Sequence, residues 1–149
     1  MKTYKNFLLV SDMDGTLLNG KKIVSEANKA AINEFVAGGG RFAIATGRTP
    51  ENAKGYLKGL MVNSPSIFYN GSLLADLTNG KILKSCPLQG PLWHKFAAYC
   101  LENFPEVCLE IYTAQNLYIL SDSQFDDPRL EIEKWKYQHI SLEEAGDLD

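Results

Sequence analysis

Two aspartates, Asp12 and Asp14, directly follow a continuous apolar run, and no other stretch constrains the fold of this chain as strongly. The run, residues 7–10, does not alternate with polar residues, which is typical of a parallel strand covered on both faces. Aspartate is rarely buried unless it is paired or binds a metal. In open α/β sheets, ligands bind beyond the carboxyl ends of the strands. We therefore predict a buried strand over residues 7–10 that ends at a ligand site.

The spacing of the two aspartates favours a turn immediately after Asp12. Alternate residues of an extended chain point to opposite sides, so both carboxylates can face one ligand only if the chain curls. Gly15 permits such a turn, whose backbone N–H groups can form an anion-binding nest. Asp12 could then act as a nucleophile that forms an aspartyl-phosphate, and Asp14 as general acid and then base. Repulsion between neighbouring carboxylates separates their pKa values, which suits a charged Asp12 and a protonated Asp14.

Two other interpretations compete with catalysis at this junction. An Asp-rich turn with solvated carboxylates is common where a strand ends. A calcium-binding EF-hand loop needs oxygen ligands at its first, third and fifth positions and glutamate at its twelfth. Counted from Asp12, the fifth position is Thr16 and the twelfth is Ile23. The sequence excludes the calcium loop and leaves the solvated turn open.

The residues that follow predict a βαβ unit. Ser25 is a suitable N-cap for a helix that reaches about Val36, and the glycines at 38–40 end it. An apolar strand over 42–46 would then pair in parallel with the first strand through a right-handed crossover. The predicted fold class is therefore α/β with a Rossmann-like parallel sheet.

The rest of the chain predicts a change of architecture near residue 85. Before it we expect a helix over 51–60, a short strand over 66–69 and a hairpin over 73–84. After it, a helix near 91–104 and two antiparallel strands near 107–111 and 117–120 indicate an α+β unit. The expected domains are residues 1–84 and residues 85–149.

Three further polar residues lie at predicted strand ends. Thr46 ends the second strand, so its hydroxyl can lie beside Asp12; alternatively, it caps the helix that follows. Arg48 can bind phosphate through two hydrogen bonds or form a structural salt bridge. Asn70 follows the third strand, where shaping the backbone is the simpler role. These residues extend the predicted site along one edge of the sheet.

Residues 12–18 (DMDGTLL) resemble the first motif of the haloacid dehalogenase superfamily of phosphohydrolases, and residues 45–48 (ATGR) resemble its second. Asn70-Gly71, after residues 67–69 (IFY), is similar to a feature of its Cof-like subgroup, in which a large α/β cap is inserted after the third core strand. The resemblance covers roughly the first 90 residues closely and the remainder loosely.

This resemblance implies a magnesium-dependent phosphohydrolase that acts on small phosphorylated metabolites, such as sugar phosphates, through an aspartyl-phosphate. The Asp12 carboxylate and the Asp14 backbone carbonyl would hold Mg²⁺. Backbone amides near Met13 and Gly47, with the Thr46 hydroxyl, would bind phosphoryl oxygens. A sugar phosphomutase that uses the same phospho-aspartate, and a non-catalytic binding or regulatory fragment, are the alternatives.

Two parts of the family's catalytic set are not found: a charge-neutralising lysine and an acidic Gly-Asp motif that completes the magnesium site. Residues 146–149 (GDLD) resemble the second part superficially, but the preceding residues 141–145 are hydrophilic, so we interpret them as cap sequence. We therefore expect the N-terminal part of a longer protein, without the C-terminal part of the core and poorly active alone. An apolar edge beside residues 7–10 would then need a second chain or fragment to cover it.

Composition narrows the classes of partner. The net charge of −3, without a basic stripe, argues against nucleic acid. The N-terminal apolar run is too short for a signal peptide or a membrane span. Three cysteines, without metal-binding spacing, are expected to be free thiols in a reducing cytosol. A cytoplasmic protein that binds a small phosphorylated molecule, and neither membrane nor nucleic acid, is the expectation.

Overall fold

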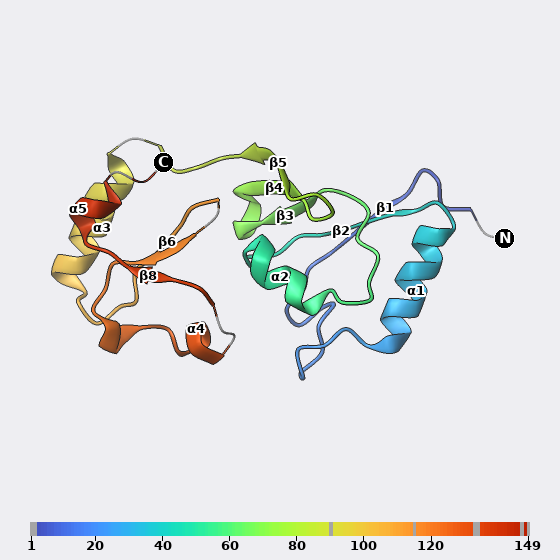
Figure 1. Cartoon of the computed structure of the whole chain (residues 1–149), viewed down its shortest axis with the longest axis horizontal. Helices are drawn as coiled ribbons and strands as arrows, with labels where there is room; N and C mark the ends of the chain where they lie inside the picture. Colours follow the sequence, from blue (N-terminus) through green and yellow to red (C-terminus); the bar gives the residue numbers. More distant parts are fainter. Residues whose placement is uncertain (1–2, 90, 115, 133–134, 147, 149) are drawn as a thin grey trace. The chain divides into compact units, whose positions relative to one another are not determined.

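The computed structural model describes residues 3–89, 91–114, 116–132, 135–146 and 148. It contains two compact units, Met1–Cys86 and Pro87–Asp149 (Figure 1). The division lies two residues beyond the boundary that the sequence indicates.

The first unit begins with a βαβ arrangement, as predicted. Strand β1 (Leu8–Ser11) pairs in parallel with β2 (Arg41–Ile44), with Leu8 opposite Arg41. Helix α1 (Glu26–Ala37) connects them. The Ser25 hydroxyl accepts a hydrogen bond from the Asn28 amide at 3.2 Å, so Ser25 is the N-cap. The local signals for this helix thus coincide with its observed start.

The parallel arrangement continues to a third strand and then reverses. Strand β3 (Ser66–Phe68) lies beside β2 through a parallel bridge between Ala45 and Ile67. Strands β4 (Leu73–Asp76) and β5 (Lys81–Ser85) form the predicted antiparallel hairpin, and β4 also pairs antiparallel with β3. A short 3₁₀ turn, Tyr69–Gly71, joins β3 to β4.

Helix α2 (Pro50–Tyr56) is shorter than predicted and ends at Tyr56, not near residue 60. Its N-cap is Thr49, whose hydroxyl accepts from the Asn52 amide at 3.0 Å. Gly59, at a left-handed φ of 80°, turns the chain away soon after the helix ends. Because Thr49 is the N-cap of α2, the alternative interpretation of Thr46 as the helix cap is wrong.

The core of the first unit excludes strand β1. Its buried apolar side chains come from the turn after β1, from α1 and α2, and from strands β2 to β4; they are Met13, Leu17, Leu18, Val24, Ile32, Phe42, Ile44, Ala53, Leu57, Phe68, Leu73 and Ala75. Phe7, Leu8, Leu9 and Val10 are between 42% and 63% exposed. The prediction of a strand buried on both faces is thus wrong for this chain, because β1 has β2 as a neighbour on one side only among the described residues.

The second unit is α+β. It contains, in order, α3 (Leu92–Asn103), β6 (Glu110–Tyr112), β7 (Leu117–Ile119), a 3₁₀ turn (Ser123–Phe125), α4 (Pro128–Ile132), β8 (Gln138–His139) and α5 (Leu142–Ala145). Strand β7 is central, antiparallel to β6 and parallel to β8. Leu117, Ile119 and Leu130 form its small core.

The end of the second unit is helical. Residues 141–145, interpreted as too hydrophilic for a buried core strand, contain α5, whose N-cap Ser141 forms a capping box with Glu144. Of the GDLD segment, Asp147 and Asp149 lie outside the described residues. Cys86, Cys100 and Cys108 are free. None of the helices within the described ranges is long and apolar enough to cross a membrane.

Candidate active site

The chain turns sharply where β1 ends. The Asp12 carbonyl accepts a hydrogen bond from the Leu17 amide at 3.3 Å, and the Met13 carbonyl accepts from the Leu18 amide at 2.8 Å. Gly15 has a φ of 77°, in the left-handed region that favours glycine. Met13 is fully buried and anchors the turn in the core. The predicted curl after Asp12 is therefore present.

Asp12 is exposed at the end of β1. Its backbone carbonyl also accepts a hydrogen bond from the Ser11 hydroxyl at 2.8 Å. Within the described part of the chain, its carboxylate has no hydrogen bond or ion pair. Two lone-pair-bearing oxygens at a strand end are thus open to a ligand.

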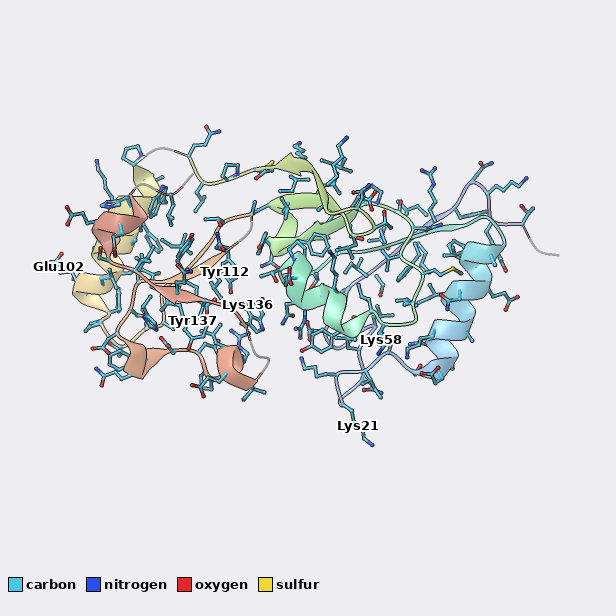
Figure 2. The ribbon with its side chains drawn as sticks, in the orientation of Figure 1. Lys21, Lys58, Glu102, Tyr112, Lys136 and Tyr137 are labelled. Carbon is cyan, nitrogen blue, oxygen red and sulfur yellow. The ribbon has the colours of Figure 1, made fainter. Side chains whose placement is uncertain are left out.

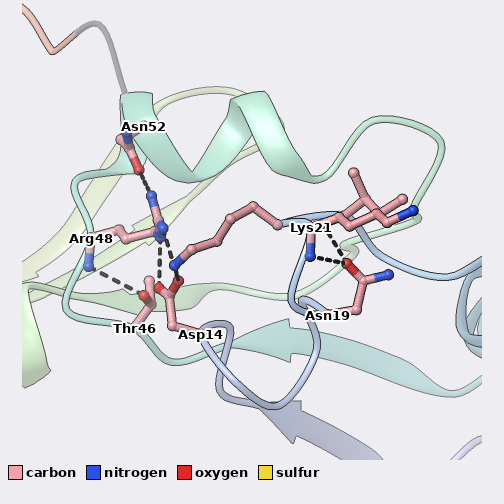
Figure 3. Close-up of polar contacts among 8 residues, drawn as sticks. Asp14, Asn19, Lys21, Thr46, Arg48 and Asn52 are labelled. Atoms are coloured by element: carbon pink, nitrogen blue, oxygen red, sulfur yellow. Dashed lines mark hydrogen bonds and ion pairs between the residues drawn. The ribbon is translucent and has the colours of Figure 1, made fainter. Parts of the chain in front are cut away.

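Both carboxylate oxygens of Asp14, by contrast, accept hydrogen bonds. Arg48 donates to it from two nitrogens, Nε to Oδ2 at 2.7 Å and Nη2 to Oδ1 at 2.8 Å. Figure 3 shows the guanidinium group between Asp14 and Asn52, which accepts a further bond from Nη1. The guanidinium also lies 4.4 Å from the ring centroid of Tyr56. Two roles were considered for Arg48, and the structure shows one of them, the structural salt bridge. Binding of phosphate by Arg48 stays a prediction.

Hydrogen bonding by Arg48 holds the pKa of the Asp14 carboxyl well below its usual range. Partial burial opposes this shift, and Lys22 adds to it with an ammonium group 2.6 Å from Oδ1. The expectation that carboxylate repulsion would leave Asp14 protonated is wrong for this arrangement. Arg48 and Lys22 together lower the pKa of Asp14 more than partial burial raises it, so Asp14 is a charged hydrogen-bond acceptor.

The loop after β2 carries the other predicted residues. The Thr46 side chain is buried, and its hydroxyl accepts from the Arg48 amide at 3.2 Å. Gly47 leaves room for Asn70, since a Cβ on Gly47 would lie 2.9 Å from the Asn70 side-chain oxygen. Asn70 has a φ of 54°, and its amide donates to the Thr46 carbonyl at 3.2 Å. These contacts fit the backbone-shaping role expected of Asn70.

The sequence interpretation missed Lys22. The sequence signal is Asn19-Gly20, a dipeptide typical of turns, which can bring the next residues back toward the strand end. The turn forms, with the Lys22 amide donating to the Asn19 carbonyl at 2.8 Å. The described site therefore brings together Asp14, Arg48 and Lys22 through contacts, with Thr46 next to Arg48 on the same loop.

The donors available to a metal are few but chemically suitable. No group of three His, Cys, Asp or Glu side chains that could hold a metal ion occurs among the residues described. Mg²⁺ commonly binds through one or two protein oxygens and completes its shell with water and substrate phosphate. The open Asp12 carboxylate and the Asp14 carbonyl fit that pattern, so these residues can hold Mg²⁺ with the help of other ligands.

Comparison with known proteins agrees with this geometry. A family model described as haloacid dehalogenase-like hydrolase matches residues 9–148. This chain belongs to that family, within its Cof-like group. The match extends through both units, beyond the first 90 residues in which the motifs are clearest. The α/β fold class and the family resemblance are thereby confirmed.

Individual relatives are phosphatases by name. A provisionally named phosphatase of Buchnera aphidicola subsp. Baizongia pistaciae is 32% identical over 117 residues, which are 78% of this chain and 43% of that protein. The 5-amino-6-(5-phospho-D-ribitylamino)uracil phosphatase YcsE of Bacillus subtilis is 39% identical over 69 residues, 46% of this chain and 28% of that protein. The chain thus spans less than half the length of these relatives.

Solved structures show the same fold. A sugar phosphatase of haloacid dehalogenase subclass IIB superposes with a TM-score of 0.77 at 18% identity, over 97% of this chain and 56% of that one. A haloacid dehalogenase-superfamily phosphatase of Bacteroides thetaiotaomicron gives a TM-score of 0.75 at 18% identity, over 95% and 52%. At these identities the similarity concerns the fold alone.

Proposed function

We propose that this haloacid dehalogenase-like chain provides the nucleophile of a phosphohydrolase that acts on phosphate monoesters of small metabolites, sugar phosphates among them. The observation that carries the proposal is the contrast between the two aspartates. Asp12 is exposed and its carboxylate is unpaired within the described residues, whereas Asp14 is held by Arg48 and Lys22. A nucleophile needs a carboxylate that is open to the substrate, and Asp12 meets that need.

In the proposed reaction, an Asp12 oxygen attacks phosphorus, and the bond from phosphorus to the leaving oxygen breaks to give an aspartyl-phosphate. Water then attacks that phosphorus, releases phosphate and regenerates the Asp12 carboxylate. Bound Mg²⁺, held by Asp12 and the Asp14 carbonyl, would offset repulsion between carboxylate and phosphoryl oxygens. The amides of Met13 and Gly47 and the Thr46 hydroxyl would position the phosphoryl group.

The role of Asp14 in this reaction depends on its partners. As general acid it would protonate the leaving oxygen, which requires a proton that the present contacts with Arg48 and Lys22 disfavour. As general base it would accept a proton from water, and the same contacts disfavour that step because it also protonates Asp14. We therefore propose that Asp14 transfers protons, first as acid and then as base, only when its cationic contacts are weakened.

The proposal is tested by phosphate release from an aryl phosphate with Mg²⁺, with Mg²⁺ removed by a chelator, and with Asp12→Asn. We expect slow release that needs both the metal and Asp12. The variant should remain folded, because the Asp12 carboxylate has no partner within the described ranges. Release that persists in Asp12→Asn would contradict the proposal, as would the absence of any metal-dependent release.

We also propose that another polypeptide covers the free edge of β1. The exposed side chains of Leu8, Leu9 and Val10 form an apolar strand without a charged residue, which favours pairing with a further strand. In isolation the chain should therefore self-associate as its concentration rises. Leu9→Lys, 42% exposed in the wild type, should reduce this association without unfolding the chain. A wild-type chain that sediments as a folded monomer at all concentrations would refute the idea.

A further inference from the structure

Lys22 is presented to the site by a small hairpin that is anchored in the core. Leu18 and Val24 pair as an antiparallel bridge, and both side chains are almost completely buried. Between them, the Asn19 side-chain oxygen accepts from the amides of Lys21 and Ile23, at 2.9 and 3.2 Å. These bonds close the tip of the hairpin, and Figure 3 shows the one from the Lys21 amide to the Asn19 side chain.

The backbone of Lys22 itself is unusual. Its φ of 58° lies in the left-handed region, which residues other than glycine, asparagine and aspartate rarely occupy. In the observed turn, the Lys22 ammonium group reaches Asp14, 2.6 Å from Oδ1. Its neighbour Lys21 extends outward from the first unit instead (Figure 2). The two adjacent lysines therefore have different environments.

The two cations on Asp14 also differ. The Arg48 side chain is 8% exposed and is fixed by Asp14, Asn52 and Tyr56. The Lys22 side chain is 53% exposed and has a flexible stem, so its ammonium group can move between Asp14 and a neighbouring anion. Asp12, Asp14, Arg48 and Lys22 together carry no net charge. A phosphoryl dianion on Asp12 would give these four residues and the bound group a net negative charge.

We propose that Lys22 is a substrate-binding residue, whose ammonium group contacts the anionic oxygens of a phosphate monoester held at Asp12. The inference rests on the proposed phosphohydrolase function, and it assigns to the hairpin a cation that no sequence motif indicated. Because Arg48 keeps Asp14 charged and oriented, Lys22 can leave Asp14 for the substrate without leaving that carboxylate unpaired.

The test compares binding of inorganic phosphate, in the presence of Mg²⁺, by the wild-type chain, Lys22→Asn, Lys22→Arg and Lys21→Asn, measured by calorimetry. Asparagine tolerates the left-handed backbone at position 22 and removes the charge. Loss of one charge-assisted hydrogen bond at a half-exposed position should weaken phosphate binding about tenfold. Lys22→Arg should recover most of the affinity, and Lys21→Asn should bind like the wild type.

Unfolding by urea shows whether Lys22→Asn acts only through the fold, since a structural role would lower its stability relative to Lys21→Asn. Equal phosphate affinities in Lys22→Asn and Lys21→Asn would overturn the role of Lys22 and leave the proposed function intact. A wild-type chain that neither binds phosphate nor releases it from an aryl ester would overturn both. If turnover occurs but phosphate binds too weakly to measure, the KM of the aryl ester replaces its affinity, and an unchanged KM in Lys22→Asn overturns the inference.

Discussion

Replacing Arg48 by methionine should destabilise the first unit by about 3 kcal/mol. Methionine fills similar space and keeps apolar contact with Tyr56, but it loses the charge and all the donors. Because Asp14 is 40% exposed and can be rehydrated, we assign about 1.5 kcal/mol to its paired bonds. The bond to Asn52 adds about 1 kcal/mol, and the contact with the Tyr56 ring about 0.5–1 kcal/mol.

The assay must report on the first unit, and the two tryptophans do not. Trp93 and Trp135 both lie in the second unit, Pro87–Asp149. Amide hydrogen exchange in peptides from β2 and α2 reports on the first unit directly. A loss of 3 kcal/mol should speed exchange of its most protected amides about a hundredfold, while tryptophan fluorescence reports on the second unit in the same sample.

Arg41→Met is the matched control, because Arg41 is an exposed arginine on β2 whose side chain forms no hydrogen bond, ion pair or ring contact among the described residues. Its effect should stay within about 0.5 kcal/mol. Equal exchange rates in Arg48→Met and Arg41→Met would refute the assignment of Arg48 as the residue that holds Asp14 and α2 together.

Two further predictions concern the same loops. The lowered pKa of Asp14 means that its charged form is bound more favourably in the folded chain, so its contribution to stability is present above the unfolded pKa of about 3.9 and is lost as the pH falls below it. The difference in urea stability between the wild type and Asp14→Asn should therefore be constant from pH 7 to 5 and shrink at pH 3.5; a difference that grows on acidification would contradict the ion pairs. Gly47→Ala should cost about 1–3 kcal/mol, because the new Cβ would lie 2.9 Å from the Asn70 side-chain oxygen. Asn70→Gly suits the φ of 54° and removes the obstructing side chain, so the double variant should recover most of that loss in urea unfolding; additive losses would show that the close approach is not the cause.

The elements of the first unit could be predicted because their signals are local. The Ser25 cap, the glycines after α1 and the apolar run of β2 each act within a few residues of the element they define. The exposure of β1 could not be predicted in this way. Whether an apolar strand is buried depends on its neighbours, and an apolar run is the same sequence with one neighbour or with two.

The second unit shows where periodicity misleads. Alternation predicted a strand from residue 107, but β6 begins at Glu110. At Leu109 the amide donates to the Ser121 hydroxyl at 3.1 Å, so a side chain replaces the backbone partner that a regular ladder would supply. Strand β8 has two residues, too few for any periodic pattern, and it is held by its parallel pairing with β7.

The candidate site depends on local sequence signals and also on contacts between residues that are far apart in the chain. Asp12 and Asp14 are the same residue type and are separated by one residue, so nothing in the motif decides which carboxylate is open to a ligand and which is paired. The decision comes from Arg48, 34 residues away, which the parallel pairing of β1 with β2 brings to the same edge of the sheet. Burial then fixes Arg48 on Asp14, whereas the exposed Lys22 remains free to exchange one anion for another. If this division holds, removing Arg48 should impair stability more than phosphate affinity, and removing Lys22 should do the reverse. If Lys22 formed only a surface salt bridge with Asp14, its removal would not weaken phosphate binding more than it lowers stability.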